Sequence, residues 1–272
     1  MIQADAPIGV LDAGFGGYTV VKELQQLLPQ EDIIFYGDGK NQPYGNRSKR
    51  VILDLIRQCL LFFQEKRVKV VAVGCNTIST LIDEYQDDFP FKIISIVRAG
   101  SDTVIQQHPK KVILLSTVFT SKSGCYEQYI HETYPDIQVI SRGSKWLARL
   151  IEDGDFNLEK IKQEIRVSLD DAVHQHPDAD TLILGCTHFP LVKDTIQELY
   201  PHIVNMINPA SAQAQQVKNY LEKNSGLHKE GRGSFHIYTT SDCEIYTHMA
   251  SVIGLNVSAP VSLVPAPVPL PE

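Results

Sequence analysis

The strongest constraint on the fold is a regular alternation of short apolar runs with longer amphipathic segments. Continuous apolar runs at 68–74 and 179–185 are typical of strands that are buried on both faces of a sheet. Segment 48–68 instead spaces its apolar residues three and four apart, which predicts one face of a helix. This alternation predicts β–α units that form parallel sheets, so the chain is assigned to the α/β class.

The same pattern predicts where the main elements lie. We expect strands at 8–13, 32–38, 68–74, 110–117, 136–141 and 179–185. We expect helices between a glycine-rich start at 15–17 and Pro29, over 48–68, up to Pro135, and over 158–175. Cys59 lies on the apolar face of the second helix, which favours core packing for that thiol.

Two stretches of the sequence are alike. "VAVGCNT" ends in Cys75-Asn76-Thr77, and "LILGCTH" ends in Cys186-Thr187-His188. Each half also opens with a strand, at 8–13 and at 110–117. These matches suggest a duplicated α/β unit. Ligands bind at the carboxyl ends of parallel strands, so facing halves would place Cys75 and Cys186 on opposite walls of one cleft.

Composition excludes several classes of protein. The 272 residues carry a net charge of −7 without an extended basic cluster, which argues against nucleic-acid binding. No apolar run is long enough to span a membrane, and no secretory signal is visible at the N-terminus. Five scattered cysteines without C-x-x-C indicate free thiols rather than disulfides or a zinc site. We therefore expect a cytoplasmic protein, with no metal, no membrane and no nucleic-acid partner.

The paired cysteines suggest a specific chemistry. One thiolate can remove a proton from a carbon atom while a facing thiol returns a proton to the opposite side, which inverts a stereocentre. His188 and the two threonines next to the cysteines could stabilise an anion. The alternative is that both cysteines are small buried hydrophobic residues, as most free cysteines are.

Other polar segments leave alternatives open. "DAGFGG" (12–17) could bring backbone N–H groups close to an anion, but Thr19 stands where a dinucleotide fingerprint needs glycine. "NQPYGNRS" (41–48) is either an anion-binding turn or an ordinary loop. Thr117 and Thr120 could face the cleft or cap the next helix, and Glu152 alone resembles a surface acid.

Together these segments resemble glutamate racemase, of the aspartate/glutamate racemase superfamily. The motifs that match are "DAGFGG", "GDGKNQPYG", "GCNT", "TVFTSKSGCYE", "IEDG", "GCTHFPL" and "YTTSD", in the family's order across most of 7–255. The resemblance implies two similar, pseudo-symmetric α/β domains with mainly parallel sheets and the active site in the cleft between them. Residues 1–97 with 208–272 would form one domain, and 98–207 the other.

The resemblance also implies a function. The chain would be an isomerase that interconverts L- and D-glutamate without a cofactor and supplies D-glutamate for bacterial peptidoglycan, and it would form a homodimer. The implied catalytic residues are Cys75 and Cys186, with Asp12 assisting the first cysteine, His188 the second, and Glu152 close to the second. The implied substrate-binding residues are Asp12, Ala13, Pro43, Tyr44, Gly45, Cys75, Asn76, Thr77, Thr117, Thr120, Cys186, Thr187 and His188.

The sequence departs from the family pattern at several positions. Ala13 replaces the usual serine, which removes a hydroxyl expected to contact substrate, and Gly39 and Gln42 stand where the family often has other residues. "VRAG" (97–100) lacks the common proline. These departures leave open a racemase acting on aspartate or another acid, or a non-catalytic binding protein on the same fold. The tail 258–272, rich in proline and valine, predicts an extended strap and lies outside the resemblance.

Overall fold

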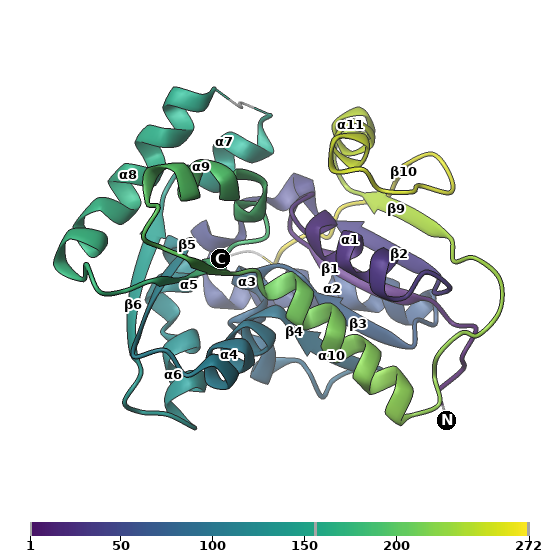
Figure 1. Cartoon of the computed structure of the whole chain (residues 1–272). Coiled ribbons are helices and arrows are strands. Elements are labelled where there is room, and N and C mark those ends of the chain that lie inside the picture. The colour runs from purple at the N-terminus through teal and green to yellow at the C-terminus, as the bar shows by residue number, and fades with distance from the viewer. Residues whose placement is uncertain (1, 155–156, 271–272) are drawn as a thin grey trace.

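The computed structural model describes residues 2–154 and 157–270. Within these residues the strands form two sheets, one of six strands in the order β10-β9-β2-β1-β3-β4 and one of four in the order β6-β5-β7-β8. Every pair of neighbouring strands in both sheets is parallel. The two sheets lie side by side (Figure 1). The structure therefore confirms the predicted α/β class and the parallel sheets.

The six-stranded sheet and the helices around it come from both ends of the chain. Its strands are β1 (Ile8–Asp12), β2 (Ile33–Gly37), β3 (Val70–Val73), β4 (Lys92–Ser95), β9 (Phe235–Thr239) and β10 (Ser262–Leu263). The helices in the same parts of the chain are α1 (Tyr18–Leu27), α2 (Lys49–Glu65), α3 (Asn76–Ser79), α10 (Pro209–Lys223) and α11 (Cys243–Ile253). Short 3₁₀ turns lie at Gly39–Asn41, Tyr44–Asn46 and Ile82–Glu84.

The four-stranded sheet comes from the middle of the chain. Its strands are β5 (Lys111–Thr117), β6 (Gln138–Ser144), β7 (Thr181–Gly185) and β8 (Asn205–Ile207). The helices here are α4 (Ile96–Gln107), α5 (Val118–Ser123), α6 (Cys125–His131), α7 (Leu147–Glu152), α8 (Leu158–Gln175) and α9 (Lys193–Leu199), with a 3₁₀ turn at Phe189–Val192. The division into two domains, 1–97 with 208–272 and 98–207, remains a prediction.

The two sheets repeat one strand order. β2-β1-β3-β4 in the first sheet corresponds to β6-β5-β7-β8 in the second, so β1 matches β5 and β3 matches β7. Strand β3 ends at Val73, and Gly74 separates it from Cys75. Cys186 directly follows the end of β7. The two cysteines therefore occupy equivalent places, as the duplicated sequence pattern predicted.

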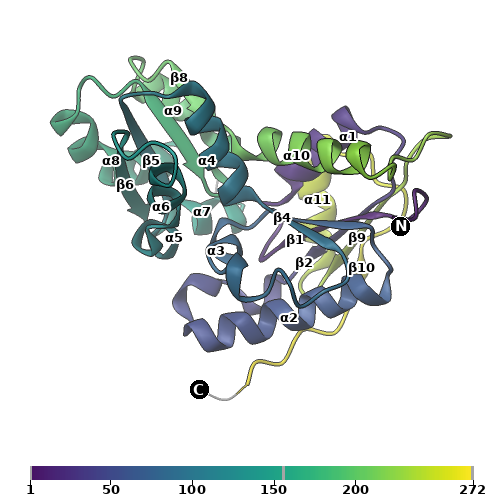
Figure 2. The same cartoon turned by 90° about the horizontal axis from the view of Figure 1, so that it is seen from below.

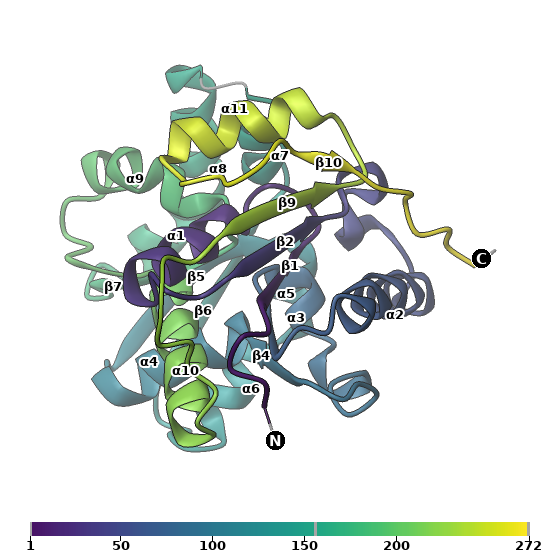
Figure 3. The same ribbon diagram turned by 90° about the vertical axis from the view of Figure 1, so that its right-hand side faces the viewer.

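Side chains that alternate along the strands divide the core of the six-stranded sheet into two apolar layers, one on each face. Val10 and Phe35 point to the face that is covered by α1, α10 and α11, whereas Leu11 and Tyr36 point to the face covered by α2. Successive side chains of a strand point to opposite faces, so a sheet that is covered on both sides needs continuous apolar runs. Cys59 is fully buried on the α2 side, which confirms its predicted packing role. Figure 3 shows α2 and α11 on opposite sides of this sheet.

Several elements differ from the predicted ones. Strands β4, β8 and β9 and helices α4, α10 and α11 were not predicted. The predicted strand 136–141 lies at 138–144. Its extent is determined by its pairing with β5, in which Gln138 lies opposite Lys111 and Ser144 opposite Thr117. Helix α6 ends at His131 instead of continuing to Pro135. Residues 155–156 fall outside the described part of the chain.

The C-terminal tail is extended, as its composition predicted. After the two-residue strand β10, the tail continues without regular structure to the end of the described chain. It passes along α2 (Figure 2). There the backbone of Val268 exchanges hydrogen bonds with the side chain of Gln58, at 3.0 and 3.1 Å. None of the helices in the described residues is long and apolar enough to cross a membrane.

Candidate active site

A cavity of about 410 Å³ lies where the carboxyl ends of the two sheets meet. Loops after β1, β2 and β3 form one wall, and loops after β5, β6 and β7 form the other. Its lining residues are Asp12, Ala13, Gly14, Gln42, Pro43, Tyr44, Gly45, Cys75, Asn76, Thr77, Thr117, Val118, Phe119, Ser144, Lys145, Trp146, Ala148, Arg149, Cys186, Thr187 and His188. The cavity thus brings together both predicted cysteines and most of the predicted substrate contacts.

Cys75 lies at the start of α3, on the wall formed by the six-stranded sheet. Burial and the charge of Asp12 raise the pKa of its thiol well above the ordinary value, against the opposing effect of the backbone amides of Ile78 and Ala13. A thiol with a raised pKa keeps its proton at neutral pH, and its thiolate, once formed, is a stronger base. Cys75 is therefore suited both to deliver a proton and to remove one from a weak carbon acid.

Asp12 ends β1 and is almost completely buried. Burial raises the pKa of its carboxyl group to about 6, although the charge of His188 and hydrogen bonds from Gly14 N (2.9 Å) and Thr187 Oγ1 (3.0 Å) favour the charged form. The loss of hydration at a buried carboxylate outweighs these contacts. The carboxyl group therefore exchanges its proton near neutral pH, which suits a group that assists proton transfer at Cys75.

Cys186 has a different set of neighbours. Its Sγ lies 3.6 Å from Nδ1 of His188, and Nε2 of the same ring forms a short hydrogen bond with Oε2 of Glu152. Burial alone would lower the pKa of His188, but its hydrogen bonds with Cys186 and Glu152, together with their charges, raise that pKa well above the ordinary value. The ring is therefore charged at neutral pH and can pass a proton to the sulfur atom.

The two walls touch across the cavity through the loop after β1. Thr187 Oγ1 donates to Asp12 Oδ2, as described above, and Thr19 Oγ1 contacts Thr187 O at 3.3 Å. A Cβ atom added at Gly16 would clash with Thr187 Oγ1 and lie 2.6 Å from His188 Nδ1. Gly16 of "DAGFGG" is thus explained by the close approach of the opposite wall rather than by a nucleotide phosphate.

Two threonines, one from each wall, contact each other at the cavity. Thr77 Oγ1 lies 3.3 Å from Thr117 Oγ1, and Thr117 caps α5 by accepting from Thr120 N. Thr120 does not line the cavity but lies behind Thr117, whose hydroxyl it contacts at 3.1 Å. Its side chain is almost completely buried. The direct substrate contact that we predicted for Thr120 therefore remains a prediction. Asn76 Oδ1 accepts from Tyr126 OH at 2.8 Å, which fixes its amide.

The loop after β2 is held by a buried carboxylate. Asp38 accepts hydrogen bonds from Tyr44 OH (2.6 Å), Asn41 Nδ2 (2.9 Å) and Thr240 Oγ1 (2.7 Å). Asp38 is fully buried, so it is not available to hold the ribose of a nucleotide. Its contacts instead fix Tyr44 and Gly45 at the cavity.

Several lining residues were not predicted. Ser144 ends β6, and Lys145, Trp146 and Arg149 follow it, at the end equivalent to the loop after β2. The sequence prediction ended that strand at residue 141, so these residues did not fall at a strand end. Gln42 was noted only as a departure from the family pattern. Glu152 was predicted and touches His188, but it does not itself line the cavity.

The geometry defines what the site can do. Two thiols at equivalent strand ends line one cavity, and each has its own ionisable neighbour, Asp12 for Cys75 and His188 for Cys186. This arrangement can protonate and deprotonate one carbon atom from two sides. Within the described residues, no group of three or more histidine, cysteine, aspartate or glutamate side chains is arranged to hold a metal ion.

Comparisons with known proteins point to one family. The family model for Asp/Glu/hydantoin racemase matches residues 19–217. A curated relative, glutamate racemase 2 of Caldanaerobacter subterraneus subsp. tengcongensis, is 35% identical over 248 residues, which cover 91% of this chain and 92% of the relative.

Solved structures that are similar to this chain come from the same family. A glutamate racemase isoform of Bacillus anthracis superposes with a TM-score of 0.91 at 29% identity, over 98% of this chain and 100% of that one. The glutamate racemase of Francisella tularensis, solved with D-glutamate, has a TM-score of 0.88 at 28% identity, over 96% and 98% of the two chains.

Proposed function

Because the chain belongs to the Asp/Glu/hydantoin racemase family and is an amino-acid racemase, we propose that it interconverts L- and D-glutamate by proton transfer through Cys75 and Cys186. The observation that carries the proposal is the placement of both thiols at equivalent strand ends around one cavity. A non-catalytic binding protein would need neither the second thiol nor a separate ionisable partner for each. The proton-transfer residues are intact although Ala13 removes one expected substrate contact.

In the proposed reaction, the α-carbon of glutamate lies between the two sulfur atoms. One thiolate removes the α-proton, and the other cysteine, as a thiol, delivers its proton to the opposite face, which inverts the centre. Asp12 takes up or returns the proton of Cys75, and His188, held by Glu152, does the same for Cys186. The roles of the two sides exchange when the other enantiomer reacts.

The carbanion formed on the way needs stabilisation, since the α-proton of an amino acid is weakly acidic. Fixed donors in a site that excludes water stabilise developing negative charge far better than bulk water does. Asn76, Thr77 and Thr187 supply such polar groups for the amino and α-carboxylate groups. The loop that carries Tyr44 and Gly45 would receive the side-chain carboxylate.

The remaining assignments are part of the same proposal. D-glutamate made in this way would supply bacterial peptidoglycan synthesis and so support cell shape. The cytoplasmic location and the homodimer are expectations that accompany that role. The reaction is proposed to need no added cofactor, because the proton carriers are side chains of the chain itself.

The test is an exchange experiment in heavy water. The purified enzyme is incubated separately with L-glutamate and D-glutamate, and α-deuterium incorporation and optical rotation are followed over time. We expect both enantiomers to lose their α-proton and to reach an equal mixture. Exchange of aspartate in place of glutamate would identify an aspartate racemase instead. If neither amino acid exchanges its α-proton, the proposed function is wrong.

A further inference from the structure

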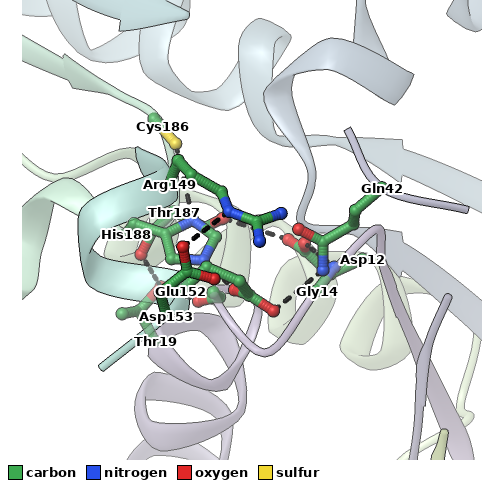
Figure 4. A network of polar contacts seen from close by, with 11 residues as sticks. Asp12, Gly14, Thr19, Gln42, Arg149, Glu152, Asp153, Cys186, Thr187 and His188 are labelled. Carbon is green, nitrogen blue, oxygen red and sulfur yellow. Dashed lines mark hydrogen bonds and ion pairs between the residues drawn. The ribbon is translucent and has the colours of Figure 1, made fainter. Parts of the chain in front are cut away.

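One polar contact joins the two walls and has no part in the proton transfers described so far. Gln42 lies in the loop after β2, on the wall of the six-stranded sheet, and Glu152 ends α7 on the opposite wall. Gln42 Nε2 donates to Glu152 Oε1 at 2.8 Å. Figure 4 shows the amide of Gln42 reaching toward Glu152 beside Gly14. The two side chains thus connect segments that are 110 residues apart in the sequence.

This contact completes the binding of the Glu152 carboxylate. Oε2 accepts from the His188 ring, and Oε1 accepts from Gln42. A carboxylate that is bound at both oxygen atoms by groups in fixed positions cannot rotate about its terminal bond without losing one contact. The ring that it orients lies with its other nitrogen 3.6 Å from Cys186 Sγ. Gln42 is therefore the outer end of a chain of contacts that leads through Glu152 and His188 to the sulfur atom.

The backbone beneath this contact leaves room for it. A Cβ atom added at Gly14 would clash with Gln42 Nε2 and lie 2.7 Å from both carboxylate oxygens of Glu152. A side chain at that position would push the two groups apart. Glu152 is only slightly exposed, with 13% of its side chain accessible, so its contacts are little diluted by water. The glycine loop of one wall thus directly supports a hydrogen bond between the walls.

We propose that Gln42 is a positioning residue for proton transfer at Cys186, although it lies on the wall of Cys75. It orients Glu152, which holds the His188 ring toward Cys186, and it makes this orientation depend on the approach of the two walls. The inference rests on the proposed two-base racemisation. Its distinguishing consequence concerns one cysteine, since loss of Gln42 removes a hydrogen bond of the Cys186 side and none that holds Cys75 or Asp12.

The variant that tests this is Gln42→Met, which keeps the length of the side chain and removes the donor. Gln216→Met is the matched control, because Gln216 Nε2 donates to Asp102 at 2.7 Å between α10 and α4, away from the cavity. We expect Gln42→Met to lower kcat about 10-fold and Gln216→Met to leave it unchanged. Both proteins are checked for a cooperative thermal transition. Gln42→Asn, whose amide is one methylene short of Glu152, replaces Gln42→Met if that variant does not fold.

The decisive measurement is α-deuterium exchange without inversion, relative to inversion, for each enantiomer in heavy water. When Cys75 removes the proton and Cys186 delivers slowly, the carbanion more often takes a solvent-derived deuteron back from Cys75. We expect this ratio to rise for one enantiomer only in Gln42→Met. An unchanged ratio, or an equal rise for both enantiomers, overturns the role of Gln42. An inactive wild-type enzyme overturns the racemase proposal itself, so the two failures are distinguishable.

Discussion

The two walls of the cavity share one topology but differ in chemistry. Cys75 and Cys186 follow equivalent strands, β3 and β7. The wall of Cys75 offers a buried carboxyl group, Asp12, at the end of β1, whereas the equivalent end of β5 carries Thr117. The wall of Cys186 offers the His188 ring instead. The repeated strand order therefore determines where the thiols lie, and the residues at the strand ends and in the loops determine which ionisable group serves each thiol.

This difference affects the charges that the ionisable groups of each wall carry before substrate reacts. The pKa of Cys75 is raised well above its ordinary value by burial and by the charge of Asp12, so this thiol keeps its proton at neutral pH. The pKa of His188 is raised well above its ordinary value by its contacts with Cys186 and Glu152, despite burial, so the ring holds a positive charge beside the other sulfur. One wall thus carries a negatively charged assistant and the other a positively charged one. The reaction itself is symmetric, because L- and D-glutamate have equal free energies.

The largest expected effect comes from removing either sulfur. Cys75→Ser and Cys186→Ser should each lower racemisation about 10²- to 10⁴-fold, since an alcohol is a much weaker acid than a thiol. The comparison of the walls predicts more than a loss. Each variant should retain α-proton exchange for the enantiomer whose proton the remaining cysteine removes, and the retained enantiomer should differ between the two. Proton NMR of the α-hydrogen in heavy water measures this for each enantiomer.

The same experiment can disprove the assignment of Cys75 and Cys186 as the two catalytic bases. Full racemase activity in either serine variant would show that one thiol is dispensable. Retention of the same enantiomer in both variants would show that the walls do not act on opposite faces. Cys59→Ser is not a suitable control because that thiol is buried in the core, so Cys243→Ser, at the partly exposed start of α11, is used instead.

A smaller effect is expected from Asp12→Asn. The rate should fall about 10- to 100-fold, because the amide cannot accept the proton of Cys75. In the wild type, kcat should fall as the pH is lowered through about 6, where Asp12 gains its proton. The variant should lack this decline, since the pKa of His188 lies well above its ordinary value and the ring stays charged over the same range. A pH profile of kcat for both proteins checks it; an unchanged decline near pH 6 would assign it to another group.

The same substitution should stabilise the fold. Asp12 keeps its proton to about pH 6 in the folded chain, whereas its ordinary pKa is 3.8. Between these values the folded state binds more protons than the unfolded state, so the free energy of unfolding falls as the pH rises. Above pH 6 the whole cost is present, at most about 3 kcal/mol. Asp12→Asn should therefore melt at a higher temperature than the wild type at pH 7 and show little gain at pH 4. A lower melting temperature at pH 7 would contradict this.

Much of the fold could be predicted from the sequence because the main strands are continuous apolar runs. The helix at 158–175 was predicted to the residue, and five of the predicted strands lie within two residues of their observed bounds at each end. Strand β6 was placed wrongly because its sequence mixes polar and apolar residues, and its extent follows from pairing with β5. Strands β4, β8 and β9 were not predicted. Short strands at 92–95 and 205–207 are fixed by their neighbours in the sheet rather than by their own composition.

In the candidate site, too, some features could be predicted from the sequence and others could not. Residues at the ends of predicted strands, such as Asp12 and Cys186, could be placed at the cavity because parallel strands converge there. Contacts between the walls could not be predicted, since they depend on how the two sheets are placed. Gln42 is the clearest example, because its partner Glu152 is remote in sequence and lies on the opposite wall.

The smallest expected effect concerns the C-terminal tail, whose described residues contact the wall of Cys75. Asn41 Nδ2 donates to Pro267 O at 3.0 Å and also to Asp38, the carboxylate that accepts from Tyr44. The tail is held by backbone hydrogen bonds, and Val268 remains largely exposed. The tail therefore buries little apolar surface, but at Pro267 it contacts a loop that lines the cavity.

Removal of residues 266–272 tests this connection, because it deletes the Pro267 carbonyl and keeps β10 and the hydrogen bond from Val264 N to Thr239 O. Loss of one hydrogen bond that orders the loop should raise KM for glutamate about two- to tenfold, with kcat changed less. Gln58→Ala, which weakens the tail's hold on α2 without touching Asn41, should give a smaller rise in the same direction. Steady-state kinetics in both directions measure the effect. An unchanged KM in the truncated enzyme would show that Asp38 and Asn41 hold the Tyr44 loop without the tail, and the support of this wall would then be wholly internal to its sheet.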